Sequence, residues 1–164
     1  MSLDSTLEFL SGTPLARVIS QGALSFPTLE CIHVVAISIV VGTIAIVDLR
    51  LLGYRSHRRG VRQLIRDVLP YTWAAFGVAA LAGALLFVSS APRYAHNPQF
   101  QLKLVLIVAA AINMAFFHLT IYRRVAHWDD LLPPPTQARI AGATSLCLWI
   151  AVIFLGRWVG FTLQ

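Results

Sequence analysis

The stretch LECIHVVAISIVVGTIAIVDLRLLG, residues 29–53, decides the fold. It is almost wholly apolar between Glu30 and Arg50, and as a helix it is long enough to cross the roughly 30 Å hydrocarbon core of a bilayer. Yet His33 lies near one end and Asp48 near the other. Because an ionisable side chain inside a membrane costs roughly 2.5–3.5 kcal/mol or more, both residues point to a function.

The composition of the whole chain agrees with an integral membrane protein. Of its 164 residues, 57% are hydrophobic and 12% are charged, about half of the ~25% that is usual in soluble domains. The mean hydropathy is +0.72. The net charge of +6 comes from short loops between apolar segments, which indicates a membrane-topology signal and no nucleic-acid partner.

Four apolar stretches have roughly the 20 residues that a membrane-spanning helix needs. They are residues 29–52, 71–90, 100–122 and 140–161. In lipid a backbone must satisfy its own hydrogen bonds, so each stretch is predicted to be a helix. The sequence therefore predicts an all-α, four-helix transmembrane domain over residues 29–164.

Two shorter segments are predicted to lie on the membrane surface. Residues 1–28 have rough helical spacing of apolar side chains, interrupted by Gly12 and Pro14, and predict one or two short interfacial helices. Residues 61–69 predict a separate basic amphipathic helix, with Pro70 in the first turn of the second span.

Lysine and arginine residues predict the orientation of the spans. Nine of them lie at one end of the predicted bundle, in or beside the first and third loops. The other end has four, which are Arg17, Arg93, Lys103 and Arg157. The positive-inside rule places the nine in the cytoplasm. We therefore expect a multi-pass protein of the bacterial inner membrane with both termini on the periplasmic side.

Polar residues of the first and third spans form two levels. Asp48 follows His33 by 15 residues, and His118 follows Lys103 by 15 residues. At 1.5 Å per residue each step covers about 22 Å of depth. Since the two spans run in the same direction, His33 and Lys103 are predicted to share an outer level, and Asp48 and His118 an inner level.

The two levels of polar residues favour haem b as the cofactor. A haem between helices needs an imidazole nitrogen on iron, small residues that admit the macrocycle, and bases near its propionates. The predicted iron ligands are His33 and His118, and Lys103 and Arg93 are predicted to serve propionates or a quinone. The other predicted cofactor contacts are Asp48 and Arg50, which would orient the inner site, and Asn113.

The partner of each ligand stays open. An outer haem would pair His33 with His96 or with another sixth ligand. An inner haem would use His118, with candidate partners His57, His127 and Met114.

Other functions remain open from the sequence. The favoured role is electron transfer or a membrane redox subunit, whose partners would be a redox protein, a larger membrane complex or a second copy of the chain. The alternatives are a structural or accessory subunit whose polar residues only lock helices together, and proton or small-solute translocation through Asp48, Arg50 and His118. A quinone or a lipid could also occupy the cavity instead of haem.

The first and third spans carry a resemblance to a known family. ECIHVVAISIVVGTIAIVDLRLLG is followed by APRYAHNPQFQLKLVLIVAAAINMAFFHLTIY. The DLRLLG end of the first span, the NP-x-F-x-x-K opening of the third and its N-x-x-x-FH close resemble a family of small four-span bacterial membrane proteins of unknown function. The match covers about residues 29–160.

A more distant similarity implies a cofactor. Two stretches are similar to membrane protoporphyrinogen oxidases of the HemJ type: the LH-like start of the first span and QLKLVLIVAAAINMAFFH in the third. The start of the first span is also similar to the copper-resistance D membrane domain. The HemJ group is associated with haem b. By this resemblance, His33, Lys103 and His118 would be the functional residues.

Overall fold

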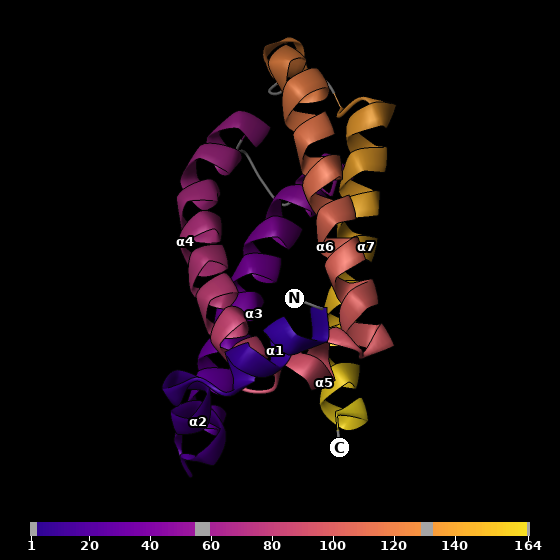
Figure 1. Cartoon of the computed structure of the whole chain (residues 1–164). Helices are drawn as coiled ribbons and strands as arrows, with labels where there is room; N and C mark the ends of the chain where they lie inside the picture. The colour runs from indigo at the N-terminus through magenta and orange to yellow at the C-terminus, as the bar shows by residue number, and fades with distance from the viewer. Residues whose placement is uncertain (1–2, 55–59, 129–132, 164) are drawn as a thin grey trace.

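Four long helices form the body of the protein (Figure 1). They are α3 (Ser25–Leu51), α4 (Val61–Val88), α6 (Pro98–Phe116) and α7 (Thr136–Thr162). Each is long and apolar enough to cross a membrane. The computed structural model describes residues 3–54, 60–128 and 133–163, and no strand occurs among them. The predicted all-α membrane bundle is confirmed.

Proline and asparagine fix where two of these helices begin. The Asn97 side chain accepts a hydrogen bond from the Phe100 amide at 3.0 Å, and Pro98 occupies the first turn of α6. Pro135 precedes the first residue of α7. Because a helix start fixes the direction of every later side chain, Asn97 sets the faces on which Lys103 and the rest of α6 lie.

The beginning of α4 corrects the sequence prediction. Residues 61–69 are not a separate surface helix but the first turns of α4, which passes through Pro70. Val61 and Ile65 are buried in a cluster that includes Leu51 of α3. This burial offsets the helical hydrogen bond that Pro70, without an N–H, cannot make. α4 is curved along its length (Figure 1), as is usual for a helix with an internal proline.

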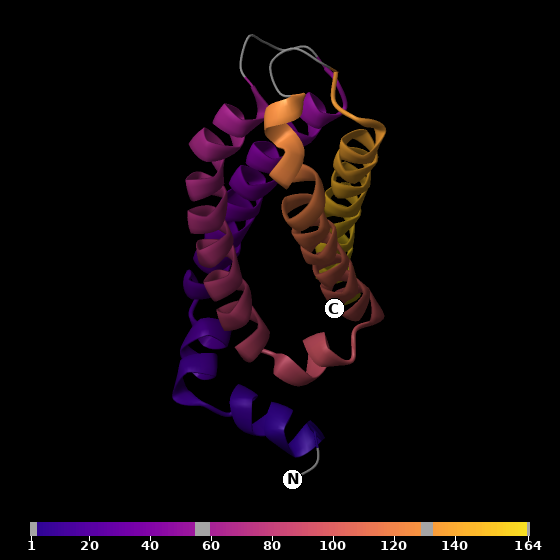
Figure 2. The same cartoon turned by 90° about the horizontal axis from the view of Figure 1, so that it is seen from above.

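The long helices are arranged as two hairpins. α3 packs along α4, α6 packs along α7, and α3 also packs on α7. Over the described parts of the chain, no comparable packing joins α4 to α6. The two helices stand apart on one side of the bundle (Figures 1 and 2).

Small residues bring the helices close together. A Cβ atom on Gly142 of α7 would lie 3.0 Å from the backbone oxygen of Asp48, so this position admits no larger side chain without displacing α3. The hydroxyl groups of Thr43 and Thr72 are 2.9 Å apart and join α3 to α4. A cluster containing Val40 and Trp149 fills the middle of the bundle.

Three short helices lie at the end of the bundle where the chain terminates (Figure 1). They are α1 (Leu3–Ser11), α2 (Pro14–Gln21) and α5 (Ala91–Ala95). α1 packs on α5, and the Ser11 hydroxyl accepts a hydrogen bond from the Ala91 amide at 2.9 Å. The first 28 residues thus contain two short helices, as the interrupted spacing predicts.

The outward faces of the long helices remain apolar. Val35, Val105 and Ile150 are each more than half exposed. A surface of this kind is suited to lipid, since water would make it an aggregation site. The apolar surface and the four long helices together indicate a multi-pass protein in a bilayer.

Candidate functional site

A cavity of about 270 Å³ lies between α4 and α6, with α3 and α7 behind it. Its volume is close to the lower end of the roughly 300–1,000 Å³ that is typical of ligand pockets. The wall is mostly apolar and includes the aromatic side chains Trp73, Phe76 and Trp149. The polar residues that line it are Thr43, Asp48, Thr72, Asn113, His118 and Ser145. We call it the lateral cavity, because it lies on the side where α4 and α6 stand apart (Figure 2).

His118 lies on a distorted turn at the end of α6. The helix continues from Phe117 to Ile121 as a π-helical turn, a feature that is frequent at functional sites. The His118 ring packs edge-on against Phe117 and beside Tyr122, with centroid distances of 5.4 and 5.5 Å. These contacts and the wider turn direct the imidazole to the cavity wall.

The tautomer of His118 follows from its hydrogen bond. Nδ1 lies 3.0 Å from the carbonyl oxygen of Met114. A carbonyl oxygen only accepts, so Nδ1 must carry the hydrogen, and the neutral ring then has a lone pair on Nε2. His118 therefore offers the cavity a hydrogen-bond acceptor or a metal ligand.

Asp48 is the most deeply buried ionisable group of the site. Its side chain is 5% exposed, and none of the described residues makes a hydrogen bond to its Oδ2 atom. The Ser145 hydroxyl lies beside the carboxyl group. A buried polar atom without a partner costs about 1–3 kcal/mol. Asp48 lines the lateral cavity, and its Oδ2 atom lacks a donor among the described residues.

Asn113 connects α6 to α7 at the same cavity. Its Nδ2 donates to the carbonyl oxygen of Ala141 at 3.0 Å. Since a carbonyl cannot donate, this contact fixes the amide orientation and leaves Oδ1 as an acceptor. Asn113 therefore holds the two helices together and adds a third acceptor to the polar side of the lateral cavity.

His33 belongs to a different level of the bundle. Its Nδ1 donates to the carbonyl oxygen of Ala79 at 2.8 Å, and a Cβ atom on Gly83 would lie 2.9 Å from the ring. Lys103 lies near enough to His33 to act on it electrostatically, and its side chain passes over Gly156 of α7. His33 does not line the lateral cavity.

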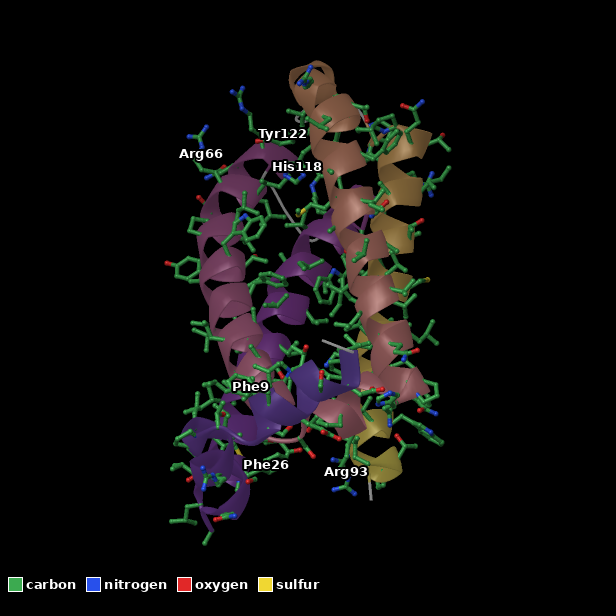
Figure 3. All side chains as sticks on the ribbon, in the orientation of Figure 1. Phe9, Phe26, Arg66, Arg93, His118 and Tyr122 are labelled. Atoms are coloured by element: carbon green, nitrogen blue, oxygen red, sulfur yellow. The ribbon has the colours of Figure 1, made fainter. Side chains whose placement is uncertain are left out.

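The remaining predicted residues lie outside the cavity. Nδ1 of His96 donates to the Pro92 carbonyl at 2.8 Å, and its Nε2 is 3.3 Å from Asp4 Oδ1. Arg93 is exposed on α5, at the opposite end of the bundle from His118 (Figure 3). Arg50 is half-buried near the end of α3.

The surroundings of Tyr94 on α5 favour its neutral phenol. Burial raises the pKa of Tyr94, the Glu30 carboxylate raises it further, and Arg93 opposes both.

The structure therefore separates the predicted site residues into two groups. Asp48, His118 and Asn113 line one cavity, and His33 with Lys103 forms the other level. His57 and the side chain of His127 lie outside the described residues. Within the described ranges, no group of three or more His, Cys, Asp or Glu side chains could hold a metal ion.

The sequence analysis did not identify every residue that shapes the two polar levels. Ser145 lies in an apolar helix, where a lone serine gives no signal of a site. Gly156 of α7 gives no signal either, yet it makes room for the Lys103 side chain, as Gly83 of α4 does for His33. These contacts between helices can be seen only once the helices are packed in three dimensions.

Comparison with curated proteins and with solved structures finds no match. Residues 20–162 match the model of a family of unknown function, DUF6644. This range includes all four long helices and both levels of polar residues. The chain therefore belongs to the family of unknown function DUF6644.

Proposed function

We propose that this protein is a membrane redox protein whose lateral cavity binds a quinone-class ring from the lipid phase. One observation carries the proposal. Asp48, whose Oδ2 lacks a partner among the described residues, and His118, whose Nε2 keeps a lone pair, line the same apolar cavity on the side of the bundle where α4 and α6 stand apart. Such a cavity suits a ligand with an apolar body and oxygen atoms that form hydrogen bonds.

The size and lining of the cavity support this class of ligand. A volume of about 270 Å³ suits a single substituted ring, and an apolar tail can leave between α4 and α6. Trp73, Phe76 and Trp149 present aromatic faces and edges to such a ring. On the α6 side, the short side chains of Ala110 and Ala111 leave room for the ring.

Haem b is the second candidate, and the geometry of His118 favours it. A metal-ligating imidazole usually donates its other nitrogen to a carbonyl or carboxylate, as His118 does to Met114. The sequence motifs of the first and third spans, which resemble those of HemJ-type oxidases, favour the same candidate. A bound haem would supply one-electron chemistry, and His118 would hold its iron.

The fit of haem is partial, which is why we place it second. Among the described side chains, His118 is the sole imidazole that lines the cavity. Lys103 and Arg93, the predicted propionate contacts, do not line it. Quinone binding needs neither a second ligand nor these bases.

One purification tests both candidates. We expect solvent extraction of the detergent-purified protein to release a quinone, and His118→Ala to reduce its amount at least fivefold while His33→Ala leaves it unchanged. A dithionite-reduced minus oxidised spectrum of the same samples tests haem. Sharp b-type bands that His118→Ala abolishes would replace quinone with haem. Protein with neither cofactor would leave an accessory or translocating role.

We also propose the orientation in the membrane. The arginine-rich loops face the cytoplasm of a bacterium, and both termini lie in the periplasm. A redox role further requires a partner redox protein or a larger membrane complex that exchanges electrons with the chain.

A topology assay checks the orientation. Alkaline phosphatase fused after Gln164 should be active, and the same enzyme fused after Tyr54 should be inactive, because it folds only in the periplasm. Green fluorescent protein fused at the same two positions should give the opposite pattern. An active phosphatase after Tyr54 would reverse the proposed orientation.

A further inference from the structure

We infer that the lateral cavity prefers the reduced, dihydroxy form of its ligand, a quinol, over the quinone. This inference rests on the proposed function and adds to it which redox form the site selects. It follows from the hydrogen-bonding character of the three polar residues on the α3 and α6 walls, Asp48, Asn113 and His118.

His118 makes the strongest selection. Its Nδ1 hydrogen is used by the Met114 carbonyl at 3.0 Å, so the neutral ring has only the Nε2 lone pair to offer. A quinone carbonyl has no hydrogen to give to that lone pair. A quinol hydroxyl has one, and it forms the bond that the quinone cannot.

Asp48 adds a second acceptor inside the same cavity. Asp48 is 5% exposed, and its Oδ2 lacks a partner among the described residues. A carboxyl group keeps oxygen lone pairs in either protonation state, and as a carboxylate it accepts only. The second hydroxyl of a quinol would satisfy this atom.

Asn113 does not reverse the balance. The contact from Nδ2 to Ala141 at 3.0 Å commits one of the two amide hydrogens to α7 and leaves the other as a donor beside the Oδ1 acceptor, so Asn113 serves either redox form. The cavity thus offers acceptors at three side chains on α3 and α6. A site built around acceptors rejects a ligand that lacks the matching donors, since its own polar atoms then stay unpaired.

The preference is measurable as a redox potential. We expect the quinol to bind roughly tenfold more tightly than the quinone, which corresponds to about 1.4 kcal/mol. For a two-electron couple, a tenfold difference raises the midpoint potential of the bound couple by about 30 mV above that of the free couple. Binding of both forms as a function of applied potential therefore reports the ratio directly.

The experiment uses the full chain in phosphatidylcholine nanodiscs with a decyl-substituted benzoquinone and its hydroquinone as probes. Equilibrium binding of each form is measured under argon, and the midpoint potential of the bound couple is titrated. Asp48→Asn keeps the shape of the side chain but supplies amide hydrogens. It should lower the quinol-to-quinone ratio at least fivefold and return the potential toward the free value.

Ser38→Ala is the matched control on α3. Ser38 is exposed, bonds its own helix through the Val34 carbonyl at 2.8 Å and does not line the cavity, so it should leave the ratio unchanged.

The outcomes separate the inference from the proposed function. Equal binding of the two forms, or tighter binding of the quinone, by the unaltered chain would overturn the quinol preference and leave quinone-class binding in place. Failure of both forms to bind would overturn the proposed function itself. A ratio that Asp48→Asn leaves unchanged would remove Asp48 as a selecting group.

Discussion

Ala111→Trp is expected to abolish ligand binding in the lateral cavity while the bundle stays folded. Ala111 is exposed on α6 and lines the cavity, so an indole ring at this position has room to enter it without displacing a buried neighbour. A cavity of about 270 Å³ cannot hold both an indole and a substituted ring. We expect binding of the decyl-substituted hydroquinone in nanodiscs to weaken at least tenfold.

Ala115→Trp is the matched control for this result. Ala115 lies one turn further along the same helix, is also exposed, and does not line the cavity. It should bind the probe as the unaltered chain does and unfold at the same temperature. If Ala111→Trp binds the probe normally, or if both variants lose it equally, the ligand does not occupy the lateral cavity.

Gly142→Leu is expected to cost the protein about 2 kcal/mol of unfolding free energy. A Cβ atom on Gly142 would lie 3.0 Å from the Asp48 backbone oxygen and 3.1 Å from the Leu51 side chain, so a leucine must push α7 away from α3. Overpacking of this kind typically costs 1–3 kcal/mol, even though leucine favours the helix more than glycine. Thermal unfolding in detergent, followed by circular dichroism, should show a lower midpoint.

Gly77→Leu supplies the comparison. Gly77 is also inside a long helix, but nothing lies within 4 Å of a Cβ atom built there. Removal of a helical glycine should leave the midpoint unchanged or raise it, because helix propensity improves by up to about 1 kcal/mol. Equal stability of the two variants would show that α3 and α7 do not approach each other at Gly142.

The number and type of the membrane-spanning helices could be predicted because such helices are determined by local hydropathy. The 15-residue spacing from Lys103 to His118 also places Asp48 and His118 at one depth, since rise per residue depends only on the helix. The start of α4 could not be predicted in the same way. Val61 and Ile65 read as the apolar face of a surface helix until Leu51 of α3 is known to cover them.

The candidate site shows the same limit at the level of single residues. Sequence spacing gives the depth of a side chain but not the neighbour that it meets across the bundle. It predicted a shared level for Asp48 and His118, which both line the lateral cavity, but not that His33 faces Gly83 of α4, away from that cavity. Nor could it show that α4 and α6 would stand apart, because that separation depends on how α3 packs on α7.

The separation of α4 from α6 determines how the proposed ligand would reach the lateral cavity. A molecule that enters through this side arrives by diffusion within the bilayer and never crosses the aqueous phase. Its occupancy then depends on its mole fraction among the lipids, so dilution of the membrane with extra lipid empties the cavity while dilution with buffer does not. Saturation curves plotted against mole fraction in lipid should coincide for vesicle suspensions of any concentration.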